Sequence, residues 1–192
     1  MKKSYKGAII ALILFVFLPI TESQAQRFDN LDDVPHDISY YRETRLTKPL
    51  VKVLYGRPSK NNQEVFGNLV PYGEVWRAGH NEATEIKFYQ DVKFGEQTIT
   101  AGTYVLLAIP GEKKWEVILN SNTDVWGAFQ YDSSYDVARV TVPVNKAETI
   151  ETFSISFKKK DKHIQMIMGW DNTRVKVPLK FKQEKHLAYN EE

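Results

Sequence analysis

The chain has 192 residues, no cysteine and a formal net charge of +2 from 26 basic and 24 acidic residues. The missing cysteine excludes a disulfide framework and a lipid anchor on an N-terminal cysteine. The near balance of charge gives no basic field that would favour nucleic acid or an anionic surface as a partner.

Residues 1–25 have the pattern of a secretory signal peptide. Three lysines precede an almost wholly apolar stretch at residues 8–20, and Ser23 and Ala25 supply small residues before a cleavage point. The apolar stretch is too short for a transmembrane helix, which needs about 20 such residues. We expect cleavage after Ala25, a net charge of 0 for the remainder, and a periplasmic or secreted protein without a stable membrane anchor.

The rest of the chain shows almost only strand patterns. Residues 26–48 are interpreted as an N-terminal leader, because their start is polar and aperiodic, and residues 183–192 as a charged tail. Between them, residues 49–182 alternate apolar and polar positions in short runs, or are apolar throughout, as at residues 103–109. Strands are predicted at residues 49–55, 83–90, 103–109, 115–119, 137–144, 149–157, 164–170 and 174–181.

These strands predict the fold class. Short strands separated by turn residues every 8–12 positions are typical of a sandwich or barrel. Hairpin turns are expected at residues 160–162 and 171–172. The prediction is an all-β, single antiparallel β-sandwich, jelly-roll-like, with two long loops at residues 56–83 and 121–136.

The first long loop contains a polar run just before a strand. Arg77, His80, Asn81 and Glu82 are candidate ligand-binding residues, because a guanidinium can bind an anionic or polyhydroxyl ligand with two hydrogen bonds. The structural alternative is that Arg77 pairs with Glu74 or Glu82 and braces the loop. The sequence is compatible with both interpretations.

The second long loop places aromatic residues among carboxylates, an arrangement that suits sugar rings. Trp126 and Tyr131 are the candidate ligand-binding residues in this loop. The structural alternative is that Trp126 and Phe129 close the open end of the sandwich, because large aromatic side chains usually contribute core area.

Patterns for catalysis and metal binding are weak. The four histidines form no metal-ligand spacing, and His80 with Glu82 gives only two ligands, so no metal and no cofactor is predicted. No nucleophile elbow and no phosphate-binding glycine loop is present. Whether the protein is an enzyme stays open, with a hydrolase using Glu82, His80 or Asp124 as the catalytic alternative.

Several motifs together resemble the DUF2911 family. They are YGRPSKNNQEVFGNLVPYGEVWRAGHNEATEI, AGTYVLLAIPG, WEVILN, WGAFQYD, ETFSISF and GWDNTRVKVPL, and they extend over residues 51–179. The resemblance implies an exported all-β bacterial protein, of a family seen largely in Bacteroidetes and without an established function. The positions that follow the family pattern are Arg57, Pro58, Phe66, Gly67, Trp76, Arg77, Gly79, Asn81, Glu82 and Trp126.

The expected function is non-catalytic binding of a small polar or glycan-like ligand in a cleft between the two long loops. The alternatives are the hydrolase and a structural or interaction protein of the cell envelope. The sequence leaves the oligomeric state open.

Overall fold

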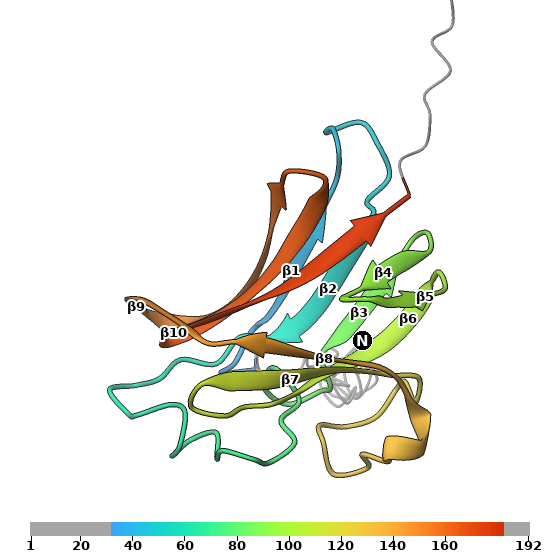
Figure 1. The fold of residues 1–192 in the computed structure, drawn as a ribbon. Helices are drawn as coiled ribbons and strands as arrows, with labels where there is room; N and C mark the ends of the chain where they lie inside the picture. Colours follow the sequence, from blue (N-terminus) through green and yellow to red (C-terminus); the bar gives the residue numbers. More distant parts are fainter. Residues whose placement is uncertain (1–31, 183–192) are drawn as a thin grey trace, which may run out of the picture. The chain divides into compact units, whose positions relative to one another are not determined.

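The computed structural model describes residues 32–182 (Figure 1). The predicted signal peptide, the first residues of the predicted leader and the charged tail lie outside this range. The described residues belong to one compact unit that begins at Asp32. Between residues 32 and 182, no helix has the length and apolar character that a membrane span requires.

The first sheet has six antiparallel strands in the order β1-β2-β3-β6-β7-β8. Neighbouring strands in this sheet are mostly neighbours in the sequence, and each pair is antiparallel. The strands are β1 (His36–Tyr41), β2 (Val51–Gly56), β3 (Glu85–Phe88), β6 (Gly102–Ile109), β7 (Lys114–Asn120) and β8 (Asp136–Pro143).

The second sheet has four antiparallel strands in the order β5-β4-β10-β9. The strands are β4 (Val92–Phe94), β5 (Gln97–Ile99), β9 (Asn145–Lys160) and β10 (His163–Phe181). Strands β9 and β10 form a long bent hairpin, and the end of β10 pairs with β4. The prediction of an antiparallel β-sandwich is confirmed.

The main core lies between the two sheets. Alternate residues of the strands point inward, as the burial of Val51, Val53 and Tyr55 on β2 illustrates. A smaller cluster of Ala83, Val105, Leu107 and Ile118 lies apart from this core. Residues of the second long loop pack over it and bury it. This second cluster explains why β6 is apolar on both faces, as its sequence predicted.

Three parts of the fold differ from the sequence prediction. Strand β1 falls inside the predicted leader, and the short hairpin β4–β5 was not predicted at all. The turn expected at residues 171–172 is wrong, because β10 runs through it with two changes of register. Asp171 adopts φ 47° at this irregularity, so an extended strand absorbs the turn-forming residues as a bulge.

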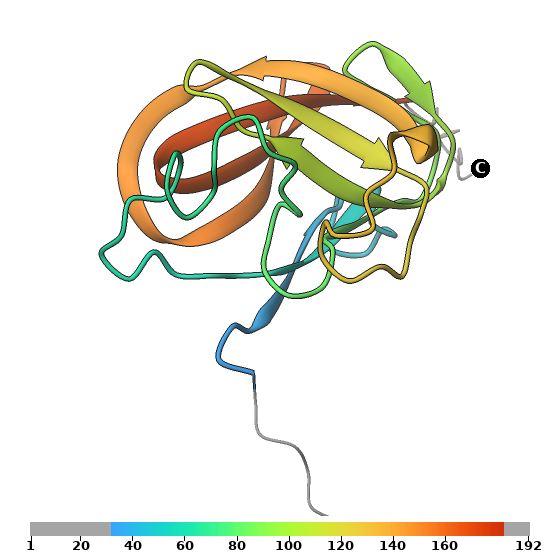
Figure 2. The same ribbon diagram turned by 90° about the horizontal axis from the view of Figure 1, so that it is seen from below.

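The two long loops are confirmed and lie at the same end of the sandwich. Residues 57–84 connect β2 to β3, and residues 121–135 connect β7 to β8 and include one 3₁₀ turn, Ser133–Tyr135. Figure 1 shows both loops at the lower side, and Figure 2 views that side directly. The β1–β2 loop and the β9–β10 turn lie at the upper side of Figure 1.

Candidate functional site

The first long loop is fastened to the bent hairpin by backbone hydrogen bonds. Ser59 forms an isolated β-bridge with Thr152, and the Phe153 amide donates to the Pro58 carbonyl at 2.9 Å. Further along the loop, Trp76 forms a bridge with Ala108 of β6. The loop therefore reaches from one sheet to the other and closes one end of the core.

Five aromatic side chains from this loop and from both sheets pack together at the closed end. The ring centroids of Phe66 and Trp115 lie 4.7 Å apart, and those of Trp76 and Phe153 lie 4.9 Å apart. The Trp76 and Trp170 rings are stacked at 6.2 Å with an angle of 21° between their planes. Because Trp76 is only half-buried, its indole belongs both to this cluster and to the surface above it.

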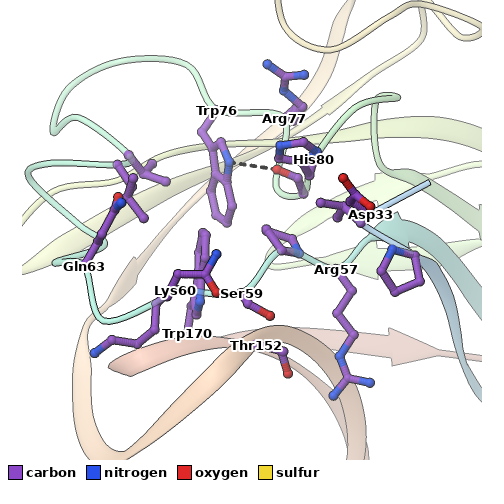
Figure 3. A pocket seen from close by; sticks show the side chains of 17 residues that line it. Asp33, Arg57, Ser59, Lys60, Gln63, Trp76, Arg77, His80, Thr152 and Trp170 are labelled. Carbon is purple, nitrogen blue, oxygen red and sulfur yellow. Dashed lines mark hydrogen bonds between the residues drawn. The ribbon is translucent and has the colours of Figure 1, made fainter.

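The largest polar-lined pocket near this cluster has a volume of about 770 Å³ (Figure 3). The first long loop provides most of its lining, the start of the described chain provides residues 33–35, and the hairpin provides Thr152 and Trp170. Figure 3 shows the Trp76 indole projecting into the pocket, with its N–H donating to the Gly79 carbonyl at 3.2 Å. The pocket thus combines an aromatic wall with polar surroundings.

Two cations of the lining are already paired with carboxylates. Arg57 lies 3.1 Å from Asp37 and also donates to the Phe153 carbonyl and the Ser154 hydroxyl. Lys60 lies 2.7 Å from Asp171, and both side chains are largely buried. The pocket lining therefore includes two cationic residues whose charges are compensated.

Two glycines allow the segment around His80 to lie against the end of β2. A Cβ on Gly56 would stand 2.1 Å from the His80 carbonyl oxygen, and a Cβ on Gly79 would stand 2.7 Å from the Thr84 hydroxyl. The neighbouring residues Ala78 and Asn81 have φ values of 48° and 58°, which is uncommon for residues with a side chain. This tight backbone places His80 on the pocket rim.

The structure separates the six residues predicted as a ligand site. Arg77 and His80 line the pocket, whereas Asn81, Glu82, Trp126 and Tyr131 do not. The pocket therefore lies between the first loop and the β9–β10 hairpin, and not between the two long loops as expected.

Arg77 braces the loop, but not through the ion pair that the sequence suggested. Within residues 32–182 it forms no salt bridge with Glu74 or Glu82; its Nη1 donates to the Asn81 carbonyl at 2.8 Å. Its guanidinium carbon lies 5.4 Å from the Trp126 ring centroid and 5.7 Å from that of Phe129. Figure 3 shows this guanidinium turned away from the pocket.

Trp126 and Phe129 do not close the end of the sandwich, and that alternative is wrong. Their rings are stacked with centroids 5.4 Å apart and planes 6° apart. The two residues are 52% and 76% exposed. They form a flat aromatic surface outside the pocket, held on one side by Arg77.

Tyr131 has a structural role in the second loop. Its hydroxyl donates to Asp136 at 2.8 Å and accepts a hydrogen bond from Arg139, which also pairs with Asp136. Burial, followed by the hydrogen bond to Asp136, raises the pKa of Tyr131 above its usual value of 10.0. The buried amide of Asn120 donates to the Asp132 carbonyl and to Asp136, so the loop is anchored by a polar network.

The last two predicted residues lie at the surface. The Asn81 amide donates to Asp32 at 2.5 Å, and Glu82 is exposed. Three or more potential metal ligands do not gather anywhere within residues 32–182. Asp33 is the acidic residue among those that line the pocket, so the lining does not offer two facing carboxylates.

Sequence reasoning missed Lys60 and Trp170 as site residues. Both are brought to the pocket by contacts across more than 90 positions of the chain, such as the bridge between Ser59 and Thr152. The Arg-Pro pair directly after β2 was a local signal, since it marks where the strand ends and the loop begins.

A comparison with protein-family models gives one match, and it covers most of the chain. The model of DUF2911, described as a protein of unknown function, matches residues 39–179. No curated protein and no solved structure matches the sequence or the fold. The matched range contains every strand from β2 to β9, part of β1, nearly all of β10 and most of the pocket lining, so the chain belongs to the DUF2911 family.

Proposed function

We propose that this protein binds a small polyhydroxylated, glycan-like ligand in the pocket beside Trp76 and does not transform it. The observation that carries the proposal is the half-buried Trp76 indole, which forms one wall of a pocket of about 770 Å³. Pockets of roughly 300–1,000 Å³ with an aromatic surface and a few polar groups are typical small-molecule sites.

The polar groups around Trp76 favour hydroxyl groups over highly charged ligands. Arg57 and Lys60 line the pocket, and Asp37 and Asp171 balance their charges. Ser59 and Thr152 add hydroxyls that both donate and accept. A sugar ring presents apolar C–H faces to an indole and hydroxyl groups to such donors and acceptors.

The geometry gives less support to the hydrolase. Of its three proposed residues, His80 lines the pocket, whereas Glu82 and Asp124 do not. Glycoside hydrolysis usually needs two carboxyl groups within about 5–10 Å of each other across the bond that breaks. Among the described lining residues only Asp33 could contribute one.

One observation favours the third candidate, an interaction protein of the cell envelope. The stacked and exposed rings of Trp126 and Phe129 offer a rigid apolar surface of the kind found at protein interfaces. This surface lies outside the pocket, so the two roles are compatible.

Calorimetric titration of residues 26–192 tests the proposal, with neutral oligosaccharides, uronate-containing oligosaccharides and nucleotides as probes. We expect saturable binding of a neutral oligosaccharide. Trp76→Phe should weaken it about tenfold, since aromatic contacts contribute about 0.5–1.5 kcal/mol beyond area burial.

Trp126→Phe is the matched control, because it makes the same change on an aromatic residue outside the pocket. It should leave the affinity unchanged. Equal loss in both variants, or no binding of any probe at millimolar concentration, would contradict the proposed site. Release of a shortened sugar during incubation would favour the hydrolase.

We also propose that the protein acts after export. The support is the signal-peptide pattern of residues 1–25, which lie outside the described part of the structure. Mass spectrometry of the protein recovered from the periplasm or the medium should give Gln26 as the first residue. Recovery of the uncleaved chain from the inner membrane would contradict this proposal.

A further inference from the structure

Basic side chains gather at the end of the sandwich that lies away from the long loops. The β1–β2 loop, the β9–β10 turn and the end of β10 meet there, and Glu43, Lys159, Lys162 and Lys182 line one small hollow. We call this region the basic end. Its cations are Arg42, Arg45, Lys48, Lys158, Lys159, Lys160, Lys162 and Lys182.

The charge of the basic end is largely uncompensated within the described chain. Glu43 and Asp161 are the acidic residues of the same segments, and the pairing of β4 with β10 places Asp91 beside Lys182. Eight cations and three anions therefore leave a net charge of +5. None of the eight cations takes part in an ion pair within residues 32–182. The near-neutral composition of the whole chain hides this separation of charge.

Apolar and aromatic groups are exposed beside these cations. Leu46 stands between Arg45 and Lys48 in the β1–β2 loop and is 98% exposed. Tyr40 is 53% exposed, and the Arg42 guanidinium lies 4.8 Å from its ring centroid. A single exposed leucine is ordinary in a soluble protein, but this one lies in a loop between two exposed cations, Arg45 and Lys48.

We propose that the basic end docks reversibly on the surface of an anionic lipid bilayer. The lysines and arginines would lie at the level of the headgroup phosphates, where each adds to the attraction. Leu46 would enter the boundary between headgroups and acyl chains, and Tyr40 would lie at the interface, where amphipathic aromatic rings are favoured. A soluble polyanion would satisfy the cations but would give Leu46 no apolar surroundings.

Docking in this orientation leaves the candidate pocket accessible. The pocket is formed mainly by the first long loop at the lower side of Figure 1, whereas the basic end is at the upper side. Membrane contact and ligand binding therefore use separate surfaces, and the failure of one proposal would not affect the other.

Vesicle co-sedimentation tests the docking surface. Residues 26–192 lack the apolar stretch of residues 8–20, which would bind vesicles by itself, and they contain the whole compact unit from Asp32 onward. We expect binding to vesicles of phosphatidylcholine with a third of phosphatidylglycerol, and none to phosphatidylcholine alone. Raising the salt from 0.05 to 0.5 M should weaken the binding strongly, because the charges are exposed.

Two variants probe the two parts of the surface. Lys159→Glu with Lys162→Glu should lower the partition coefficient at least tenfold, because each lysine near an anionic membrane increases that coefficient about fivefold. Leu46→Asp should lower it further. All three residues are exposed, so the melting temperature should not change.

Lys113→Glu with Lys114→Glu is the matched control, since it makes the same charge change on the β6–β7 hairpin. It should bind vesicles like the unchanged protein. Absence of binding to the anionic vesicles at 0.1 M salt, or an equal loss in the control, would overturn the proposal. If the protein binds soluble dextran sulfate as tightly as it binds vesicles, and if Leu46→Asp does not change this affinity, the surface would be assigned to a polyanion instead.

Discussion

The two long loops lie at the same end of the sandwich but are held in place by different interactions. The first loop sends Phe66 and Trp76 into the core between the sheets, where they contact rings from both. The second loop lies over the outer face of the first sheet and is anchored by hydrogen bonds around Asn120 and Asp136. It leaves Trp126 and Phe129 exposed to solvent.

Because of this difference, the first loop contributes to the stability of the fold, whereas the second loop offers a surface for recognition. A loop that completes the core cannot move without opening it, so the pocket residues on this loop are held rigidly. A loop anchored by polar groups on the outside of a sheet can display large aromatic rings at little cost to the core. Substitutions of the same kind in the two loops should therefore have unequal effects.

The largest effect is expected for Phe66→Ala in the first loop. Phe66 is 7% exposed and contacts Trp76, Trp115 and Trp170. Truncating a buried phenylalanine costs about 3–5 kcal/mol in the free energy of unfolding, because it removes apolar contacts and leaves a cavity. Urea denaturation followed by tryptophan fluorescence measures the loss.

Phe129→Ala makes the identical change in the second loop. Phe129 is mostly exposed and stacks only on Trp126 and the Arg77 guanidinium, so the change should stay within about 0.5 kcal/mol. A loss as large as that of Phe66→Ala would show that both loops complete the core, and the contrast between them would disappear.

A second pair compares glycines that permit close approach. Gly56→Ala places a Cβ against the His80 backbone, which cannot move independently, and should cost about 3 kcal/mol. Gly127→Ala meets the flexible Arg77 side chain and a φ of 68°, and should cost about 1–2 kcal/mol. Gly56→Ala should also abolish ligand binding. Thermal denaturation ranks the two, and the reverse order would contradict this account of the first loop.

Arg77 joins the two loops, so its removal tests whether they are coupled. Arg77→Ala loses the hydrogen bond to the Asn81 carbonyl and the contacts with Trp126 and Phe129, and should cost about 1–2 kcal/mol. Glu82→Ala should be nearly neutral, and the double variant should show the sum of the two losses. Strong non-additivity in this cycle would support an ion pair between Arg77 and Glu82, as the sequence suggested.

A smaller effect than that of Arg77→Ala is expected for Tyr131→Phe, which removes one member of the polar network. At pH 7 the loss of its hydrogen bonds should cost about 1 kcal/mol. Because burial and Asp136 raise the pKa of Tyr131 in the folded state, its contribution is complete below pH 10 and is lost as the pH rises through the raised pKa.

Denaturation midpoints measured from pH 7 to pH 11 test this dependence. The unchanged protein should lose stability above pH 10 more steeply than Tyr131→Phe. Part of the decrease should remain in the variant, since burial also raises the pKa of Tyr55. Parallel curves for the two proteins would show that Tyr131 does not contribute to the pH dependence.

Local patterns were sufficient to predict most strands but not the short or interrupted ones. The apolar run of β6 and the alternation of β2 specify strands by themselves. Strands β4 and β5 have only three residues each, too few for a period to be recognised. In β10, Asp171 and Asn172 have turn propensity, but pairing with β9 on both sides overrides it.

The site was only partly predictable for a similar reason. The polar run from Arg77 to Glu82 is contiguous in sequence, yet its tight backbone points successive side chains in different directions. His80 faces the pocket, the Arg77 guanidinium faces the second loop, and Asn81 contacts Asp32. Thr152 and Trp170 come from a hairpin that is about 70 to 110 positions further along the chain than the loop residues of the pocket, and sequence spacing carries no information about that contact.

The pairing of β4 with the end of β10 has a consequence for how the chain folds. Residues 92–94 find their partner strand only at residues 179–181, so the hairpin β4–β5 joins its sheet only when the last strand is present. Closing so long a segment is entropically costly and slows folding relative to the local hairpins. A chain that ends before residue 179 would therefore lack the strand that pairs with Phe94, and it would remain a substrate for proteases.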